Sequence, residues 1–272
     1  AAERLKQAVG AGIFLTDEPM SRHTTFRTGG PADIYIEPSG VEELKQVLDI
    51  CREENVAYTI IGNGSNLLVG DGGYRGVLIS FGKPFAQVTI EGAQVRTGAG
   101  ALLSAVAKQV LNASLTGFEF AAGIPGTIGG AVVMNAGAYG GELCQVLREA
   151  TVLTPEGEVK TLPAEELELG YRTSCVQKKG YIVLEAVLQL QPGNADDIRA
   201  VMDDLASKRR EKQPLEYPSA GSTFKRPEGH FAGRLIQDAG LRGFRVGGAQ
   251  VSEKHCGFVI NRDHATSADI LS

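Results

Sequence analysis

The chain reads Ile61-Gly62-Asn63-Gly64-Ser65-Asn66-Leu67-Leu68 directly after the apolar strand pattern Tyr58-Thr59-Ile60-Ile61. A strand that runs into two glycines, two asparagines and a serine offers closely spaced backbone N–H groups, which suit a diphosphate. The loop is not a Walker P-loop, because no Gly-Lys-Ser/Thr follows. It is not a Rossmann fingerprint, because Leu67 occupies the place of the third glycine. An ordinary Asn/Gly turn is the alternative interpretation.

A second glycine-rich segment follows at residues 121–140. It reads Ala121-Ala122-Gly123-Ile124-Pro125-Gly126-Thr127-Ile128-Gly129-Gly130-Ala131 and then, from residue 135, Asn135-Ala136-Gly137-Ala138-Tyr139-Gly140. Because this surface has little side-chain bulk and no charge, a flat aromatic ligand could lie against it. A tightly packed helix N-terminus is the alternative. Two such segments without either standard nucleotide motif favour a different dinucleotide-binding fold.

Composition agrees with a folded protein that handles small ligands. Of 272 residues, 43% are hydrophobic, 22% are charged and 35 are glycine, about 13% against a typical ~7%. The net charge is −5 and the pI is near 5.5, so no overall basic field attracts nucleic acid or an anionic membrane. The length suits two or three small lobes.

Cysteine and histidine spacing argues against metal and disulfide chemistry. The four cysteines have no C-x-x-C spacing, and the four histidines have no paired-ligand spacing, so no metal site is expected. The N-terminus lacks a signal-peptide pattern. Residues 120–141 are uncharged, but their glycines argue against a membrane span. We expect a cytoplasmic protein without membrane insertion.

Hydrophobic periodicity predicts mixed helices and strands. Ser39 followed by Glu42 predicts a capping box that opens a helix through Cys51. Further helices are expected over residues 2–9, 102–111, 196–210 and 232–239. Strands are expected over residues 32–36, 58–61, 77–79, 87–90, 95–97, 149–153, 158–162, 181–190 and 257–260. Those at 87–90 and 95–97 are expected to pair as a hairpin across residues 91–94.

Six motifs in order carry a family resemblance. They are Arg27-Thr28-Gly29-Gly30-Pro31-Ala32-Asp33, residues 62–66, residues 123–130, residues 135–140, Tyr171-Arg172-Thr173-Ser174 and Ala220-Gly221-Ser222-Thr223-Phe224-Lys225. Together they resemble the UDP-N-acetylenolpyruvoylglucosamine reductase (MurB) family, over nearly the whole chain. The short segment between Tyr171 and Ser222 resembles the family's compact type II branch.

The resemblance implies an α+β chain with a FAD-binding region of the PCMH (vanillyl-alcohol-oxidase-like) type over roughly residues 27–192. That region would consist of two subdomains, and a smaller α+β substrate-binding subdomain would follow. We place the three parts at residues 1–84, 85–192 and 193–272. No histidine lies between His23 and His230, so the FAD is expected to be non-covalent.

Motif position assigns the cofactor residues. The resemblance implies that the first loop holds the FAD diphosphate and that the second lies along the flavin and its linker. The residues concerned are Gly62, Asn63, Gly64, Ser65, Asn66, Leu67, Gly123, Ile124, Pro125, Gly126, Thr127, Gly129 and Gly130.

The resemblance also implies the reaction: NADPH-dependent reduction of UDP-N-acetylglucosamine enolpyruvate to UDP-N-acetylmuramate, for peptidoglycan precursors. Hydride addition at C3 places negative charge at C2 and in the carboxylate, and that charge needs a clamp and then a proton. Arg172 matches the family's catalytic arginine, and its guanidinium suits a carboxylate. Ser222 matches the proton donor. A surface ion pair and a Gly-Ser turn are the respective alternatives.

Substrate contacts follow from the charge of a UDP-sugar. Lys212 and Lys225 are expected to contact the substrate, and Tyr139 is expected to pack near the nucleotide or the flavin. A solvated helix end is the alternative for the basic run 208–212. The family's C-terminal glutamate has no match here. Thr266 with Asp269 predicts a helix N-cap just before Ser272, so we expect the chain to continue.

Two other functions remain open from the residues alone. One is a flavin oxidase of the same fold acting on an alcohol or a sugar. The other is a non-catalytic flavin- or nucleotide-sugar-binding protein. No long apolar stripe stands out, so a monomer is expected.

Overall fold

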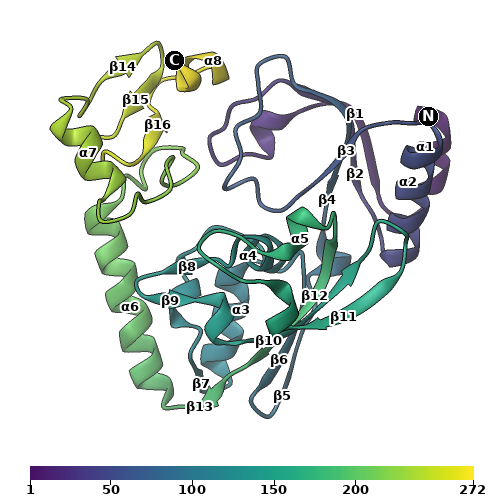
Figure 1. Ribbon diagram of the computed structural model, residues 1–272, viewed down its shortest axis with the longest axis horizontal. Coiled ribbons are helices and arrows are strands. Elements are labelled where there is room, and N and C mark those ends of the chain that lie inside the picture. The colour runs from purple at the N-terminus through teal and green to yellow at the C-terminus, as the bar shows by residue number, and fades with distance from the viewer. The chain divides into compact units, whose positions relative to one another are not determined.

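The computed structural model describes residues 1–272, which form two compact units (Figure 1). Unit 1 comprises Ala1–Phe14, Ile36–Gly62 and Ile79–Ser207. Unit 2 comprises Leu15–Tyr35, Asn63–Leu78 and Lys208–Ser272. Both units are discontinuous in sequence, so contacts between distant segments define each of them.

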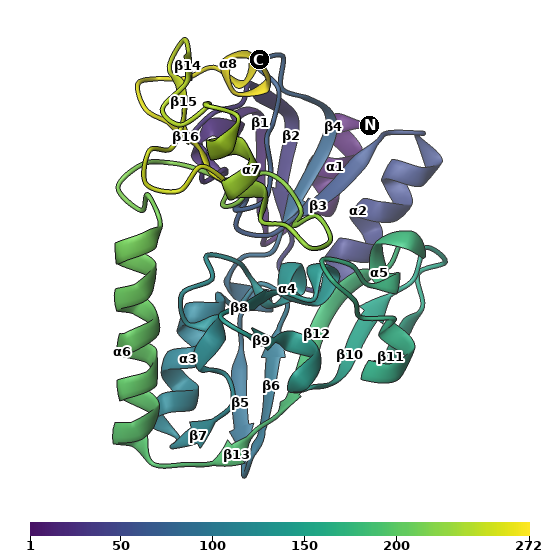
Figure 2. The same ribbon diagram turned by 60° about the vertical axis from the view of Figure 1, so that its left-hand side comes forward.

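A five-stranded antiparallel sheet in the order β11-β10-β12-β6-β5 forms the centre of unit 1. Its strands are β5 (Val88–Glu91), β6 (Gln94–Gly98), β10 (Leu147–Leu153), β11 (Val159–Pro163) and β12 (Ile182–Gln189). The predicted β5–β6 hairpin is confirmed, and its turn is tighter than predicted because Glu91 pairs with Gln94; the two strands lie side by side in both views (Figure 2). The predicted strands at 149–153, 158–162 and 181–190 are likewise confirmed, with ends shifted by one or two residues.

The core of unit 1 lies where α3 (Leu103–Asn112) and α4 (Ile128–Met134) pack with this sheet. Leu103, Val106 and Val110 give α3 its apolar face, and Phe118 just beyond it is completely buried. Helix α3 was predicted, but α4 was not, since its glycines and alanines give no helical periodicity.

Helix α2 (Val41–Glu53) begins differently from the prediction. Gly40 is the N-cap and makes no side-chain cap, so the predicted Ser39–Glu42 capping box is wrong. Glu43 takes over instead: its carboxylate accepts from the N–H of Ser39 and, at 2.6 Å, from the N–H of Gly10. The helix start is therefore tied to the loop that follows α1 (Ala2–Ala8).

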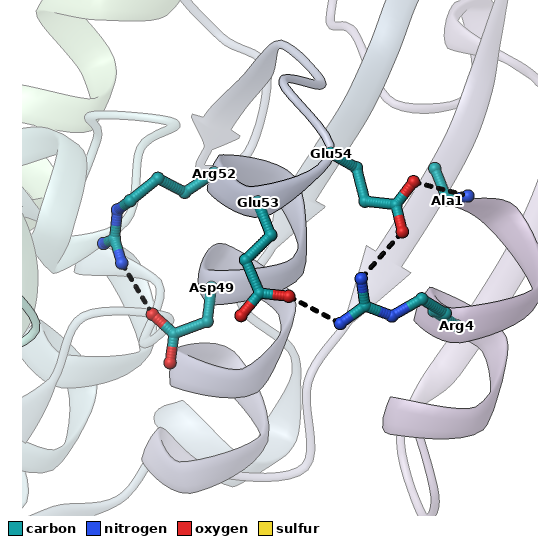
Figure 3. A network of polar contacts seen from close by, with 6 residues as sticks. All are labelled: Ala1, Arg4, Asp49, Arg52, Glu53 and Glu54. Atoms are coloured by element: carbon teal, nitrogen blue, oxygen red, sulfur yellow. Dashed lines mark hydrogen bonds and ion pairs between the residues drawn. The ribbon is translucent and has the colours of Figure 1, made fainter.

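Ion pairs add to the contact between α1 and α2. The Arg4 guanidinium lies 2.6 Å from a Glu53 oxygen and 2.7 Å from a Glu54 oxygen, and Figure 3 shows it between the two carboxylates. Within α2 itself, Arg52 pairs with Asp49 at 2.8 Å. Hydrogen bonds from Arg4 are the main cause that lowers the pKa of Glu54. Because these groups are exposed, their ion pairs contribute little to stability. We infer that the pairs of Arg4 with Glu53 and Glu54 help to set how α1 and α2 lie against each other.

We expect Glu43→Ala to lower the free energy of unfolding by about 1–2 kcal/mol at pH 7, measured by urea denaturation, because charge-assisted bonds are lost. Partial burial acts to raise the pKa of Glu43, but hydrogen bonds from Ser39, Gly10 and Gly12 outweigh it and the pKa is lowered. Stabilisation by a depressed carboxyl pKa is present above the unfolded value, near 4.3, and fades as the pH falls through the folded pKa. The difference should therefore shrink in acid. The control is Glu42→Ala, since Glu42 is largely exposed; an equal loss there would contradict this role.

The other sheets complete the architecture. A four-stranded sheet in the order β1-β2-β4-β3 comprises β1 (Ile13–Pro19), β2 (Pro31–Glu37), β4 (Tyr74–Ser80) and β3 (Tyr58–Ile61). Strand β3 has the predicted bounds. Unit 2 contains a three-stranded antiparallel sheet of β14 (Arg245–Val246), β15 (Ala249–Val251) and β16 (Val259–Asn261). Helix α7 (Ala232–Asp238) precedes it.

Short elements fill the connections. They are η1 (Met20–Arg22), η2 (Lys83–Phe85), β7 (Leu115–Thr116), η3 (Glu119–Ala121), β8 (Gly137–Ala138), β9 (Gly141–Glu142), η4 (Leu143–Gln145), η5 (Ala164–Leu167), α5 (Cys175–Lys178) and β13 (Gln191–Pro192).

Two helices frame the C-terminal part of the chain. Helix α6 (Ala195–Lys212) is longer than predicted, and no helix is both long and apolar enough to cross a membrane. Helix α8 (Ser267–Leu271) begins with the predicted cap: Thr266 and Asp269 form a reciprocal capping box. Asp71 adds to it by accepting from the N–H groups of Ser267 and Ala268 at 2.8 and 2.9 Å.

Candidate active site

The predicted diphosphate loop has a shape that only glycine permits. A Cβ on Gly62 would lie 2.5 Å from the Thr127 hydroxyl. Gly64 has φ +61°, and a Cβ there would overlap the carbonyl oxygen of His23. The Thr25 N–H donates to the Gly64 carbonyl at 3.1 Å, and this hydrogen bond stabilises the turn. Gly62, Asn63 and Asn66 are exposed, so a ligand could reach the loop.

The second glycine segment holds the start of α4. Thr127 is the N-cap, and its hydroxyl accepts from the Gly130 N–H at 3.4 Å. The N–H groups of Ile128 and Gly129 donate to the carbonyls of Ala101 and Ala99 at 2.9 and 2.8 Å. These three N–H groups are therefore hydrogen-bonded within the protein. The alternative interpretation of this segment, a tightly packed helix N-terminus, is confirmed.

Because those N–H groups already have partners, a cofactor would contact this segment at its exposed positions. Gly123, Pro125 and Gly130 are exposed. A Cβ on Gly130 would meet only the Thr127 hydroxyl, at an ordinary 3.7 Å, so the protein's own packing does not demand glycine there. A bare, uncharged backbone surface of this kind fits a flat ring. The assignment of residues 123–130 to FAD stays a prediction, carried mainly by these exposed positions.

Arg172 lies in a tight turn. Gly170 and Thr173 exchange both backbone hydrogen bonds, at 3.1 and 3.3 Å, which leaves Tyr171 and Arg172 at the tip. Arg172 has φ +56°, a conformation that bulky residues rarely adopt. Its Nη2 donates to the Gly137 carbonyl at 3.0 Å, and its guanidinium lies 5.5 Å from the centroid of the Tyr171 ring. The side chain is thus held in a defined position while other donors remain available.

Asn135 connects that turn to its surroundings, a role that the motif resemblance does not assign to it. It ends α4 in the left-handed conformation and is only 2% exposed. Its Nδ2 donates to the Gly170 carbonyl and to Glu142 Oε2, both at 3.2 Å. Its Oδ1 accepts from the Cys144 N–H at 2.9 Å. A single buried amide therefore joins the Arg172 turn to the segment around β9.

Tyr139 lies at the tip of the β8–β9 hairpin. Gly137 pairs with Glu142 and Ala138 pairs with Gly141, so Tyr139 and Gly140 form a two-residue turn. Their φ angles are +53° and +86°, as in a type I′ turn, where asparagine or glycine is usual. Tyr139 is 45% exposed. A strained, exposed aromatic residue on the hairpin that also contacts Arg172 is a good candidate for ligand contact.

Ser222 lies in unit 2 on a segment fixed at both ends. Ser222 forms an isolated bridge with Phe258, and the Thr223 N–H donates to the Gly257 carbonyl at 2.8 Å. Upstream, the Asn261 N–H donates to the Pro218 carbonyl at 2.8 Å. Ser222 itself is exposed, so its hydroxyl is accessible.

The predicted substrate lysines lie near the same segment in sequence. Lys212 is the last residue of α6 and Lys225 follows Ser222 by three positions; both are exposed. Within unit 1 the structure brings together Arg172, Gly137 and, through the shared hairpin, Tyr139. No group of His, Cys, Asp and Glu side chains that could hold a metal ion is present.

Two family models match parts of the chain. Residues 32–163 match the family model of an FAD binding domain. Residues 213–272 match that of the UDP-N-acetylenolpyruvoylglucosamine reductase C-terminal domain. The predicted PCMH-type, α+β fold is confirmed: a solved p-cresol methylhydroxylase is similar at a TM-score of 0.53 and 16% identity, over 71% of this chain and 43% of that one.

Closer relatives cover both units. A UDP-N-acetylenolpyruvoylglucosamine reductase from Agathobacter rectalis is 56% identical over 95% of this chain and 86% of its own length. The crystal structure of a MurB from Thermus caldophilus matches at a TM-score of 0.84 and 36% identity, over 96% of this chain and 91% of that chain. The chain therefore belongs to the UDP-N-acetylenolpyruvoylglucosamine reductase family of FAD-dependent oxidoreductases.

Proposed function

We propose that this FAD-dependent reductase of UDP-N-acetylmuramate synthesis takes its hydride from NADPH and relies on Arg172 and Ser222 for the chemistry of its enolpyruvyl substrate. The observation that carries the proposal is the Arg172 turn. Its left-handed φ, the Gly137 bond and the Tyr171 ring hold one guanidinium in a single position. A fixed, permanently charged fork is what a carboxylate acquiring negative charge requires.

When bound, FAD would supply the redox chemistry, the transfer of a hydride from NADPH to the enolpyruvyl group. The two glycine loops are proposed to hold it non-covalently. No histidine lies between His23 and His230, so neither glycine loop nor the sequence between them offers an imidazole for covalent attachment of the flavin. The residues proposed for FAD are Gly62, Asn63, Gly64, Ser65, Asn66, Leu67, Gly123, Ile124, Pro125, Gly126, Thr127, Gly129 and Gly130.

Arg172 and Ser222 are proposed to act in sequence on the substrate. The guanidinium binds the carboxylate of the enolpyruvyl group and stabilises the enolate that forms once C3 has gained a hydride. The Ser222 hydroxyl then gives its proton to C2. Tyr139, Lys212 and Lys225 are proposed to bind the UDP-sugar; the two exposed ammonium groups suit its diphosphate.

Anaerobic stopped-flow spectroscopy tests the proposal. NADPH should bleach the flavin absorbance, and UDP-N-acetylglucosamine enolpyruvate should restore it. NADH should bleach it more slowly at equal concentration. Recovery with oxygen alone at a catalytic rate would instead favour an oxidase, and binding without bleaching would favour a non-catalytic protein.

Organisation and location are further parts of the proposal. We propose residues 1–84 and 85–192 as the cofactor regions and residues 193–272 as the substrate region; this functional division differs from the two compact units, between which residues 1–84 are divided. All four cysteines are free thiols, as is usual in a reducing compartment, which supports a cytoplasmic location. We propose a monomer, which light scattering of the purified protein would test.

Asn135→Ala is expected to lower the rate of flavin recovery about ten- to a hundredfold while leaving NADPH bleaching within about threefold, because it frees the Arg172 turn. Asn135→Asp keeps the acceptor for Cys144 but loses the donor to Gly170, so it should resemble Asn135→Ala. Equal losses in both steps would indicate general unfolding instead. Thermal melting monitored by circular dichroism provides the control for that outcome.

A further inference from the structure

Thr25 is hydrogen-bonded to the diphosphate loop, residues 62–67. Its N–H donates to the Gly64 carbonyl at 3.1 Å. Two residues earlier, the His23 carbonyl occupies the space that a Gly64 side chain would need. The path of residues 63–67 therefore depends on the segment 23–25.

The same residue also binds the segment that leads to Ser222. The Thr25 hydroxyl donates to the Ser219 carbonyl at 2.6 Å. The same oxygen lies 3.5 Å from the Gly64 carbonyl, at the outer limit of a hydrogen bond. A hydroxyl has one proton, so the shorter contact takes it, and Gly64 is served by the backbone N–H. Thr25 thus bonds both loops at once, through two different groups.

Ser219 lies three residues before Ser222, and upstream of it the Pro218 carbonyl accepts from the Asn261 N–H. Downstream, Thr223 is fixed to Gly257. Between these points Gly221 has φ +80° and no neighbour within 4 Å of where its Cβ would lie, so no packing around Gly221 holds this short stretch in place. Only two residues separate Ser219 from Ser222, so the position of the Ser219 carbonyl helps to set where the Ser222 hydroxyl lies.

We propose that Thr25 is a positioning residue that couples occupancy of the diphosphate loop to the placement of the Ser222 hydroxyl. A ligand that orders residues 63–67 would hold the Gly64 carbonyl, thereby Thr25, and thereby Ser219. The inference rests on the proposed roles of the diphosphate loop and of Ser222.

Two variants separate the hydroxyl from the rest of Thr25. Thr25→Val keeps the shape and the N–H to Gly64 but cannot donate to Ser219. Thr25→Ser keeps the hydroxyl and is the matched control. We expect Thr25→Val to fold, because Asn261 still connects the same two segments. Its Nδ2 donates to the Phe26 carbonyl at 2.9 Å, and its N–H donates to the Pro218 carbonyl. Circular dichroism of each apoprotein checks this.

Hydrogen–deuterium exchange of each protein with and without FAD tests the coupling without any turnover. In the unaltered protein, FAD should slow exchange in residues 63–67 and also in residues 219–224. Thr25→Val should retain the first effect and lose the second, and Thr25→Ser should retain both. In stopped flow, Thr25→Val should slow flavin recovery about three- to tenfold, with bleaching by NADPH unchanged.

The outcomes distinguish the inference from the function on which it rests. If FAD fails to protect residues 63–67 in the unaltered protein, the loop assignment is wrong and the coupling falls with it. If FAD protects both segments in Thr25→Val as in the unaltered protein, the coupling alone is overturned and the proposed function stands.

Discussion

Arg172→Ala should slow recovery of the flavin absorbance by the enolpyruvyl substrate about 10²- to 10³-fold, the usual cost of losing one donor to a developing negative charge. Bleaching by NADPH should change by less than about threefold, because the substrate carboxylate takes no part in it. Any residue other than glycine at position 172 bears the same strain at φ +56°. The difference between arginine and alanine therefore reports the side chain.

Arg172→Lys sharpens the test. Lysine keeps the charge but cannot donate two parallel bonds. Flavin recovery in Arg172→Lys should therefore be at most about tenfold faster than in Arg172→Ala. The matched control is Arg96→Ala, since Arg96 forms an exposed ion pair with Glu185 in the same unit. If Arg172→Ala and Arg96→Ala recover flavin absorbance at the same rate, Arg172 does not clamp the carboxylate.

Local sequence signals predicted much of the secondary structure. The strand at Tyr58–Ile61, the β5–β6 hairpin and the Thr266–Asp269 cap depend on residues within a few positions of one another, and all three are confirmed. The capping box at Ser39 failed because two acidic residues follow it at similar spacing. Glu43, not Glu42, lies next to the loop after α1, and no short window reveals that loop.

The supports of the proposed site could not be predicted in this way. Asn135 contacts Gly170 over a separation of 35 residues, and Thr25 contacts Ser219 over 194. Motif resemblance identified Arg172 and Ser222, but a motif names positions, not the hydrogen bonds that hold them. Strand β1 was missed for a related reason: most of its residues are exposed, so it lacks the alternation that marks a half-buried strand.

Ser222→Ala should slow flavin recovery about 10²- to 10⁴-fold, the range expected when a positioned general acid is lost. The segment itself should keep its conformation, because the Thr223 N–H and the bridge to Phe258 hold it through the backbone. Bleaching by NADPH should be unaffected. The matched control is Thr223→Val, which removes the neighbouring exposed hydroxyl and should change neither step by more than about threefold.

Ser222→Cys distinguishes proton donation from mere hydrogen bonding. A thiol has an ordinary pKa near 8.5, so it can donate a proton below that pH and becomes a thiolate above it. Recovery in Ser222→Cys should therefore exceed that in Ser222→Ala at pH 7 and should fall as the pH rises past about 8.5, a limb absent from the unaltered enzyme. In Ser222→Cys, replacing H2O by D2O should slow the recovery step and leave bleaching by NADPH unchanged. A cysteine variant with no such limb, or one no faster than alanine at pH 7, would assign the proton to another group and leave Ser222 a substrate contact.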